Sequence, residues 1–230
     1  MRDDLLQVRC PIVNVHVLRD SKGLYLIDTG FIGGRRALYR ALRERGWDKD
    51  PLVGIIITHG HMDHILNVAK LSAETGAWVA APRLDLPHYA GQPVYRGASK
   101  IIGGLEAVGR PLLRYRPFMP TRLLDDGDML DVWHGLAVVH LPGHTAGHSG
   151  FYCPSLKLLF CADLYASHEN WSHFPPHIFN KNSSEARKSV SKALDLDLVG
   201  VIPNHADNAS PATHLVRLRN HYNKHDKDKT

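Results

Sequence analysis

The sequence contains few cysteines, no internal repeat and no long apolar run. Its three cysteines, Cys10, Cys153 and Cys161, have neither the even count nor the spacing of a disulfide framework, which favours a reducing compartment. The apolar stretch at 52–57 is much too short to span a bilayer. Residues 1–4 carry charges of both signs instead of the apolar block of a secretory signal. These absences predict a cytoplasmic protein without a membrane partner.

The composition is that of an ordinary globular domain. Hydrophobic residues make up 43% and charged residues 22% of the 230 residues, which is enough for one sizeable core. We therefore expect a single domain over 1–222, followed by a polar, disordered tail at 223–230. The formal net charge is +5, and several arginines fall within 35–45. This basic stretch is either the solvated face of a helix or a phosphate-binding patch, and no nucleic-acid motif accompanies it, so a nucleic-acid partner is not expected.

Strands and helices are expected to alternate along much of the chain. Hydrophobic patterning and turn signals predict strands over 12–17, 23–27, 52–58, 78–81, 123–130, 137–141, 150–153, 158–161 and 199–202. Helices are expected over 31–45, 65–76, 183–194 and 212–222. Prolines interrupt the stretch 82–118, which we interpret as an irregular insert on the substrate side with a short helix near 101–108.

The most informative segment is a cluster of potential metal ligands at 58–64. His59 and His61 occupy alternate positions of a loop that follows an apolar strand, so both imidazoles can reach one ion. Asp63 and His64 come next, at the start of a helix, and point elsewhere, which suits a second ion nearby. Imidazole and carboxylate ligands together favour zinc, and they also accept iron, manganese or cobalt.

Three further apolar strands lead to the same kind of residue. His144 lies in the glycine-containing segment 142–149, Asp163 follows the strand 158–161, and His205 follows the strand 199–202. Since loops at strand ends commonly form functional sites, this recurrence predicts one shared metal site.

The combined pattern resembles the metallo-β-lactamase superfamily. In that family His-x-His-x-Asp-His is followed by a histidine within Pro-Gly-His-Thr-x-Gly-His-Ser, then by a bridging aspartate and a final histidine. The resemblance covers residues 12–205 and implies an α/β fold, a four-layer αβ/βα sandwich of two mixed β-sheets with helices on the outside. It also implies two metal ions. The first would be held by His59, His61 and His144, and the second by Asp63, His64 and His205. The carboxylate of Asp163 would bridge both ions.

Two more residues are expected to support these ligands. Asp28 resembles the buried aspartate that lies beneath the site in the family and orients a ligand through a hydrogen bond. His148 would either support a ligand in the same way or pack in the core. The sequence departs from the family after His64, where Ile-Leu-Asn replaces frequent glycines, and around His205, where Asn204 and Ala206 replace glycines.

The predicted activity is hydrolysis by a metal-bridging hydroxide. Two ions bridged by a carboxylate lower the pKa of a shared water, and Asp63 would act catalytically by orienting that water and passing a proton to the leaving group. True zinc β-lactamases usually carry Cys or Ser where Asp163 stands, so the resemblance favours the glyoxalase II-like and lactonase-like hydrolases of small esters, thioesters and lactones. The alternatives are a mononuclear iron enzyme resembling sulfur dioxygenases and a metal-containing binding or regulatory protein without strong turnover.

A small-molecule substrate would be bound by aromatic residues near the ligands, although each of these could instead be a surface or core residue. The candidates come from the irregular insert and from the loop after Asp163: Tyr89, Tyr95, Arg96, Tyr165, Trp171 and Phe174. The identity of the metals, the natural substrate and the oligomeric state do not follow from the sequence.

Overall fold

A computed structural model describes residues 2–95 and 99–227 of the chain. Its first sheet has six strands in the order in which they occur in the sequence: β1 Leu5–Arg9, β2 Asn14–Asp20, β3 Gly23–Ile27, β4 Leu52–Ile56, β5 Trp78–Pro82 and β6 Arg122–Leu124. The first three strands are antiparallel, and β3 to β6 are parallel. This mixed sheet therefore sends several strand ends toward the same edge.

The second sheet has five strands in the order β13-β10-β9-β8-β7. Its strands are β7 Met129–Leu130, β8 Leu136–His140, β9 Ser149–Cys153, β10 Leu158–Ala162 and β13 Gly200–Pro203. Four of them are antiparallel neighbours, and β13 runs parallel to β10. A small hairpin of β11 Ala166–Ser167 and β12 Ser172–His173 follows β10.

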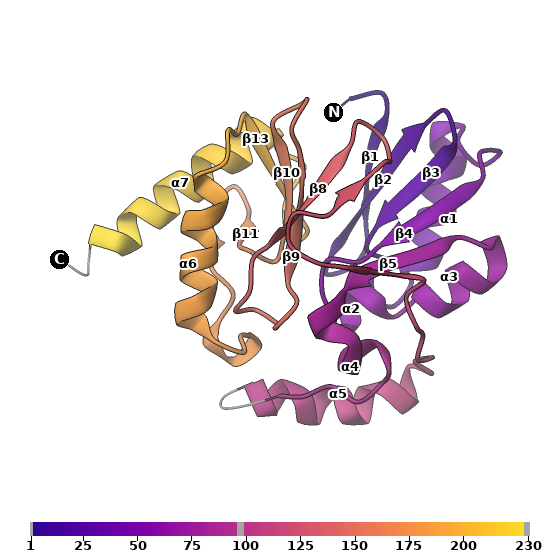
Figure 1. Cartoon of the computed structure of the whole chain (residues 1–230), viewed down its shortest axis with the longest axis horizontal. Helices are drawn as coiled ribbons and strands as arrows, with labels where there is room; N and C mark the ends of the chain where they lie inside the picture. Colours follow the sequence, from indigo (N-terminus) through magenta and orange to yellow (C-terminus); the bar gives the residue numbers. More distant parts are fainter. Residues whose placement is uncertain (1, 96–98, 228–230) are drawn as a thin grey trace.

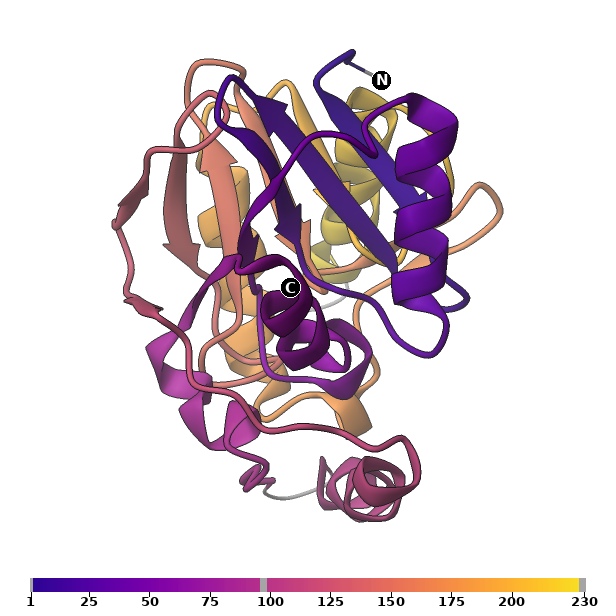
Figure 2. The ribbon, with the colours of Figure 1, turned by 90° about the vertical axis from the view of Figure 1, so that its right-hand side faces the viewer.

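Helices cover the outer face of each sheet (Figures 1 and 2). The helices on the first sheet's side are α1 Gly34–Arg45, α2 Met62–Ile65 and α3 Val68–Thr75, and those on the second sheet's side are α6 Ser183–Leu194 and α7 Pro211–Lys227. Between β5 and β6 the chain forms a 3-10 turn, η1 Arg83–Asp85, and then the helices α4 Leu86–Tyr89 and α5 Lys100–Leu112. Further along the chain, a second 3-10 turn, η3 His177–Phe179, precedes α6.

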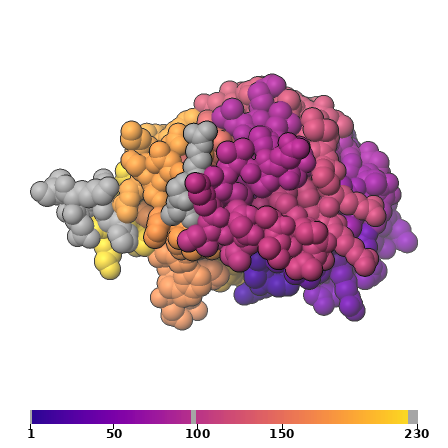
Figure 3. Space-filling model, turned by 90° about the horizontal axis from the view of Figure 1, so that it is seen from below, coloured from indigo at the N-terminus to yellow at the C-terminus, as the bar shows by residue number. Residues whose placement is uncertain are grey.

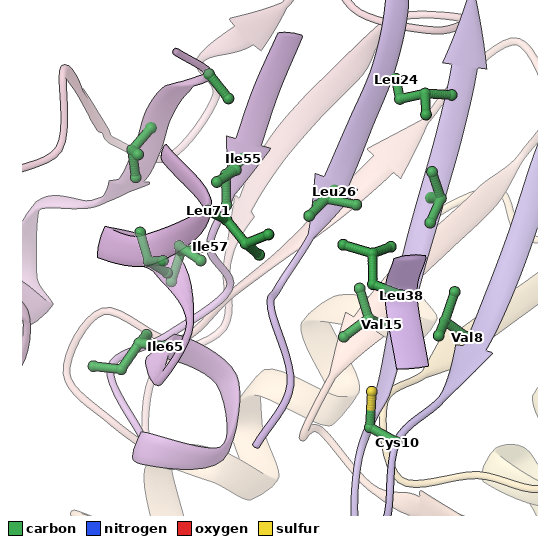
Figure 4. Packing of buried hydrophobic residues seen from close by; sticks show 14 of the residues in the cluster. Val8, Cys10, Val15, Leu24, Leu26, Leu38, Ile55, Ile57, Ile65 and Leu71 are labelled. Atoms are coloured by element: carbon green, nitrogen blue, oxygen red, sulfur yellow. The ribbon is translucent and has the colours of Figure 1, made fainter. Parts of the chain in front are cut away.

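The alternation of side chains in β3 explains the layers. Leu24 and Leu26 face the helices and pack in a cluster with Leu38 of α1 and Leu71 of α3 (Figure 4). The intervening side chains, Tyr25 and Ile27, face the other way and join the apolar core between the two sheets. A third cluster fills the space between the second sheet and helices α6 and α7. The expected four-layer αβ/βα sandwich is thus confirmed.

Several element boundaries differ from the expectation. The single strand expected over 123–130 is two short strands, β6 and β7, which belong to different sheets and are separated by a turn in which Gly127 has φ 84°. Strand β1 and the hairpin strands β11 and β12 were not predicted. The helix of the insert runs over Lys100–Leu112 and includes Pro111, and α7 continues as helix past Tyr222 to Lys227.

Helix α5 has its polar face inside and its apolar face outside. Glu106 and Arg110 are buried, whereas Leu105 and Leu112 are exposed. This inversion places a polar helix face against the loops that carry the predicted ligands. Over the described residues, no helix has both the length and the apolar character that crossing a bilayer requires.

Candidate metal centre

The seven predicted ligands lie together at one end of the two sheets, in two groups. Within each group the ligand atoms are all within 4.8 Å of one another. One group is His59, His61 and His144, and the other is Asp63, His64, Asp163 and His205. The loops after β4, β8, β10 and β13 supply these residues, so four strands that are distant in sequence converge as the pattern predicted.

Asp163 lies between the two groups. One of its carboxylate oxygens, Oδ2, is 3.3 Å from Nε2 of His144 in the first group and 3.2 Å from Nε2 of His205 in the second. The other oxygen, Oδ1, is 3.3 Å from Nε2 of His64. This one carboxylate therefore faces both groups, which is the arrangement expected of a bridging ligand.

Three of the imidazoles are oriented through Nδ1. His64 donates to Oδ2 of Asp28 at 2.8 Å, and His144 donates to Oδ1 of Asn180 at 3.0 Å. The hydroxyl of Thr58 donates to Asp28 and therefore accepts at 3.0 Å from Nδ1 of His59. With the proton held on Nδ1, each ring presents the lone pair of Nε2 to the centre.

The unsatisfied buried atoms fit a metal centre. Nε2 of His59, His64 and His144 and Oδ1 of Asp163 are all buried and have no hydrogen-bond partner within the described part of the chain. Buried polar atoms normally have a partner, and nitrogen and carboxylate oxygen are the donors that divalent transition metals accept. These four atoms fit the coordination of metal ions.

The charges in the centre follow from burial and from the two carboxylates. Burial lowers the pKa of the His59 imidazole well below its ordinary value. Burial also lowers the pKa of His205, but the carboxylates of Asp163 and Asp63 together outweigh it and raise that pKa to about 10. Burial raises the pKa of Asp163, whereas the surrounding imidazoles outweigh it and hold that pKa well below the usual range. The carboxylates therefore create a strongly negative centre that favours a cation.

Asp28 joins three parts of the site from below. It is fully buried at the end of β3, with φ 62°, and its carboxylate accepts hydrogen bonds from Thr58, His64 and Asn204. The contact with His64 is the one expected for this residue. Asn204, one of the departures from the family pattern, donates at 2.7 Å from Nδ2 and so contributes to the same network.

The departure after His64, where Ile-Leu-Asn replaces frequent glycines, also has a structural explanation. Nδ2 of Asn67 lies 3.0 Å from each of the backbone carbonyls of Thr29, Gly30 and Phe31, so this side chain holds the loop after β3 against the start of α3. Ile65, which precedes it, is fully buried in the core.

His148 contacts the backbone of a predicted ligand. Its Nδ1 donates to the carbonyl of Leu141 at 2.8 Å, and its Nε2 accepts from the backbone N–H of Asp163 at 3.2 Å. Burial lowers the pKa of His148 to about 3, so the ring is neutral near pH 7 and can accept this bond. The ring thus holds the residue that lies between the two groups.

Sequence reasoning missed Asp85 and Asn180. Asp85 is fully buried and accepts hydrogen bonds from the backbone of Gly60 at 2.8 Å, the hydroxyl of Thr145 at 2.6 Å and the backbone of Gly147 at 2.7 Å. One carboxylate therefore joins the His59–His61 loop to the loop that carries His144. In the sequence, Asp85 stands between two leucines in a segment without any motif, so its role has almost no signal there.

Helix α5 contacts the ligand loop through its buried polar face. Oε1 of Glu106 accepts from the backbone N–H of Met62 at 3.2 Å, and Oε2 pairs with Arg110 at 2.7 Å. Arg110 also donates to the carbonyl of His88, whose ring contacts the carbonyl of Gly60 at 3.1 Å through Nδ1. The insert is therefore built into the site rather than being an independent loop.

A cavity of about 590 Å³ opens beside the ligands. Of the predicted substrate-binding residues, Tyr165 and Trp171 line this cavity, and Tyr95 lines a smaller neighbouring one of about 200 Å³. The ring of Tyr95 is stacked on His61, with 6.2 Å between centroids. Tyr95 and Trp171 are in a position to contact a substrate, whereas Tyr165 is wholly buried and its hydroxyl donates to the backbone carbonyl of His214.

The other three predictions had different outcomes. Tyr89 is wholly buried and stacked on Phe118 with 5.2 Å between centroids, so the prediction of substrate contact is wrong for this residue. Phe174 packs beside His221 of α7 at 4.6 Å, outside the large cavity, and Phe179 of η3 lines the cavity instead. Arg96 lies outside the described residues.

Comparison with known proteins agrees with this geometry. The sequence profile described as "Metallo-beta-lactamase superfamily" matches residues 8–205. The chain is 33% identical over 134 residues to a hydroxyacylglutathione hydrolase of Cereibacter sphaeroides, a match that covers 55% of this chain and only 38% of that relative. It is 26% identical over 217 residues to the "Probable metallo-hydrolase YflN" of Bacillus subtilis, covering 84% of this chain and 80% of the relative.

Solved structures resemble the whole fold. A metallo-beta-lactamase family protein from Thermus thermophilus has a TM-score of 0.66 at 23% identity and covers 96% of this chain and 79% of its own. A protein crystallised in a di-iron-bound form has a TM-score of 0.66 at 25% identity and covers 92% of this chain and 96% of its own. With the profile matched over a range that contains the whole ligand set and the fold reproduced, the chain belongs to the metallo-beta-lactamase superfamily.

Proposed function

We propose that the protein is a hydrolase that uses two divalent metal ions to cleave a small ester, thioester or lactone. The observation that carries the proposal is the position of Asp163, whose carboxylate faces His144 of one ligand group and His64 and His205 of the other. Two ions held there would supply an activated water nucleophile and would polarise the carbonyl of the substrate. Zinc is the ion we propose, because the donors are all imidazole nitrogen and carboxylate oxygen.

The protein's own residues would position the reaction. His59, His61 and His144 would hold one ion, and Asp63, His64 and His205 the other. Because Asn180 and Asp28 fix two of these rings through Nδ1, the centre is formed before substrate arrives.

Asp63 would move the proton. It lines the cavity, and its Oδ2 lies 3.5 Å from Nε2 of both His64 and His205. From this position its carboxylate can hold a proton that comes from water and deliver it to the departing alcohol or thiol. Because Asp63 is also assigned to the second ion, the Asp63→Asn variant is assayed with excess metal, and it should lose most of its turnover even when both ions are bound. Full turnover with a full metal content would exclude the proton-transfer role.

The bond type is supported by chemistry and by similarity. An ester, thioester or lactone presents one carbonyl and one departing oxygen or sulfur. Two ions would polarise the carbonyl, and the proton held by Asp63 would go to the departing atom. The hydroxyacylglutathione hydrolases among the relatives are named for a reaction of this kind, although the match covers well under half of their length. Their substrate is therefore not transferred to this chain.

The test combines metal analysis with a substrate panel. Protein purified without added chelator is analysed for metal per chain, then assayed on aryl esters, thioesters, lactones and phosphodiesters with and without chelator. Two ions per chain and chelator-sensitive cleavage of a carbonyl substrate are expected. One iron per chain with oxygen uptake would instead indicate a dioxygenase, and two ions without turnover a binding or regulatory protein.

A further inference from the structure

Two separate segments of the chain contribute apolar walls to the large cavity. Helix α5 contributes Ile102, Leu105 and Gly109 to one side. Trp171 and Phe179 lie on the other side, in the segment that runs from the β11–β12 hairpin to η3. Helix α5 and η3 are in contact, so the two walls meet. Figure 3 views the molecule from the side on which α5 lies, where the surface of this helix adjoins that of the segment leading into α6.

Aromatic rings make the second wall flat. The ring of Trp171 is stacked between two imidazoles, with 4.1 Å to the centroid of His168 and 4.9 Å to that of His173. Nδ1 of His173 donates to the carbonyl of Phe174 at 2.8 Å, which holds that ring in the stack. Because imidazoles stack on the Trp171 ring, the wall is rigid, and the apolar edges of its rings can pack against a hydrocarbon chain.

The cavity lacks the permanently charged groups that would bind an anionic substrate strongly. Among the described residues, no lysine or arginine lines it, and its acidic and imidazole lining consists of ligand residues, Glu106 and the two stacked imidazoles of His168 and His173. Glu106 is already paired with Arg110 and with the backbone of Met62. The chain as a whole is basic, with a formal net charge of +5. The absence of lysine and arginine from the described lining is therefore specific to the cavity and does not reflect the composition of the protein. A carboxylate buried without a cationic partner is strongly disfavoured.

We propose that the substrate carries an aliphatic acyl chain of several carbons, which binds between α5 and the Trp171–Phe179 wall. This inference rests on the hydrolase function proposed above. In the reaction the bond between the acyl carbon and the leaving oxygen breaks, and water supplies the oxygen of the new carboxylate. One water proton goes to the leaving oxygen and the other to solvent. Substrates that carry free carboxylates, such as glutathione thioesters, are expected to be poor.

Two glycines of α5 provide a matched pair of variants. A Cβ added at Gly104 or at Gly109 meets no atom within 4 Å, so a larger side chain fits at either position. Leucine also favours a helix over glycine at both. Only Gly109 lines the large cavity. Gly109→Leu should therefore shorten the space for the chain, whereas Gly104→Leu should leave it unchanged.

The measurement is kcat/KM on p-nitrophenyl acetate, butyrate and octanoate and on S-lactoylglutathione, with the metal-loaded protein. Burial of each added methylene should raise kcat/KM up to about fourfold in the wild type and in Gly104→Leu. Gly109→Leu should keep its activity on acetate and lose at least tenfold on octanoate. Equal rates for all chain lengths, or a preference for S-lactoylglutathione over octanoate, would overturn the inference.

A binding measurement separates this inference from the function on which it rests. Neutral 1-octanol should bind to the wild type and to Gly104→Leu at least fivefold more tightly than to Gly109→Leu, as followed by calorimetry. If 1-octanol binds in this way and no ester is cleaved, the acyl site stands and the hydrolase function fails. If esters are cleaved and the two variants are alike in binding and rate, the function stands and the acyl site is wrong.

Discussion

Asn180 accepts a hydrogen bond at 3.0 Å from Nδ1 of His144 and so decides which ring nitrogen faces the metal centre. The Asn180→Ala variant should lose this orientation. Because such contacts typically change metal affinity by about 10–100-fold, we expect a loss of that size in the group that contains His144. Titration of the metal-free variant with zinc, in competition with a chromophoric chelator, measures the change.

Asn182 provides the matched control for this variant. It lies two positions further along, and its side chain caps α6 by accepting from the backbone of Ser184 and Glu185, without contact to a predicted ligand. Asn182→Ala should lower the free energy of unfolding by about 1 kcal/mol and leave zinc affinity unchanged. Equal zinc affinities for the two variants would contradict the role assigned to Asn180.

Replacement of Asp85 should destabilise the protein and loosen the first ligand group together. Asp85→Ala leaves the backbone N–H groups of Gly60 and Gly147 and the hydroxyl of Thr145 without their acceptor. Since each is a hydrogen bond to a buried charge, we expect the free energy of unfolding to fall by about 3–5 kcal/mol. Urea unfolding measures this loss. Asp125→Ala, which removes an exposed partner of Arg83, should show no comparable change.

Acid should destabilise the fold through His16. Burial lowers the pKa of this imidazole to about 3, with a smaller contribution from His214, and neither ring nitrogen has a partner in the described structure. In the unfolded chain this imidazole takes up a proton below about pH 6.5, whereas in the folded chain it stays neutral down to about pH 3. Protonation therefore costs no stability above pH 6.5, and below it the free energy of unfolding falls by about 1.4 kcal/mol per pH unit down to pH 3.

The His16→Phe variant isolates this effect. Phenylalanine keeps an aromatic ring beside Phe160, which lies 5.6 Å from His16 between ring centroids. From pH 6.5 to pH 5 the wild type should lose about 2 kcal/mol more than the variant, as measured by urea unfolding at both pH values. Parallel losses in the two proteins would show that His16 does not titrate as described.

Removal of metal should destabilise the wild type more than a chain that lacks Asp163. Ions that bind only the folded state, at one hundred times their dissociation constant, stabilise it by about 2.7 kcal/mol each. A chelator should therefore lower the thermal midpoint of the wild type. In Asp163→Ala, which lacks the carboxylate shared by both ligand groups, the chelator should lower the midpoint by less than it does in the wild type.

The ligands could be predicted from the sequence because each of them follows an apolar strand. The bounds of β3 and of α6 also agree with the prediction, because the turn signal Asp28-Thr29-Gly30 follows β3 and a helical period marks α6. The side chain of Asn182 caps α6. Local patterns of this kind reach only a few residues along the chain.

The supporting contacts could not be predicted because they join distant segments. Asp85 meets Gly147, 62 positions away, and nothing in the residues next to Asp85 signals that contact. Tyr89 resembled a surface aromatic in a proline-rich stretch, but η1 and α4 turn its ring into the core. The direction in which the insert folds depends on α5. The buried face of this helix is polar, whereas hydrophobic periodicity would predict an apolar buried face.

The glycines around the site divide it into a part that tolerates engineering and a part that does not. A Cβ at Gly60 would come within 2.3 Å of His88, and one at Gly147 within 2.9 Å of Asp85, so the loops beneath the ions admit no larger residue without displacement. At Gly109 the same addition meets open space. A laboratory library intended to change what this protein binds should therefore randomise helix α5 beside the cavity and leave the ligand loops as they are.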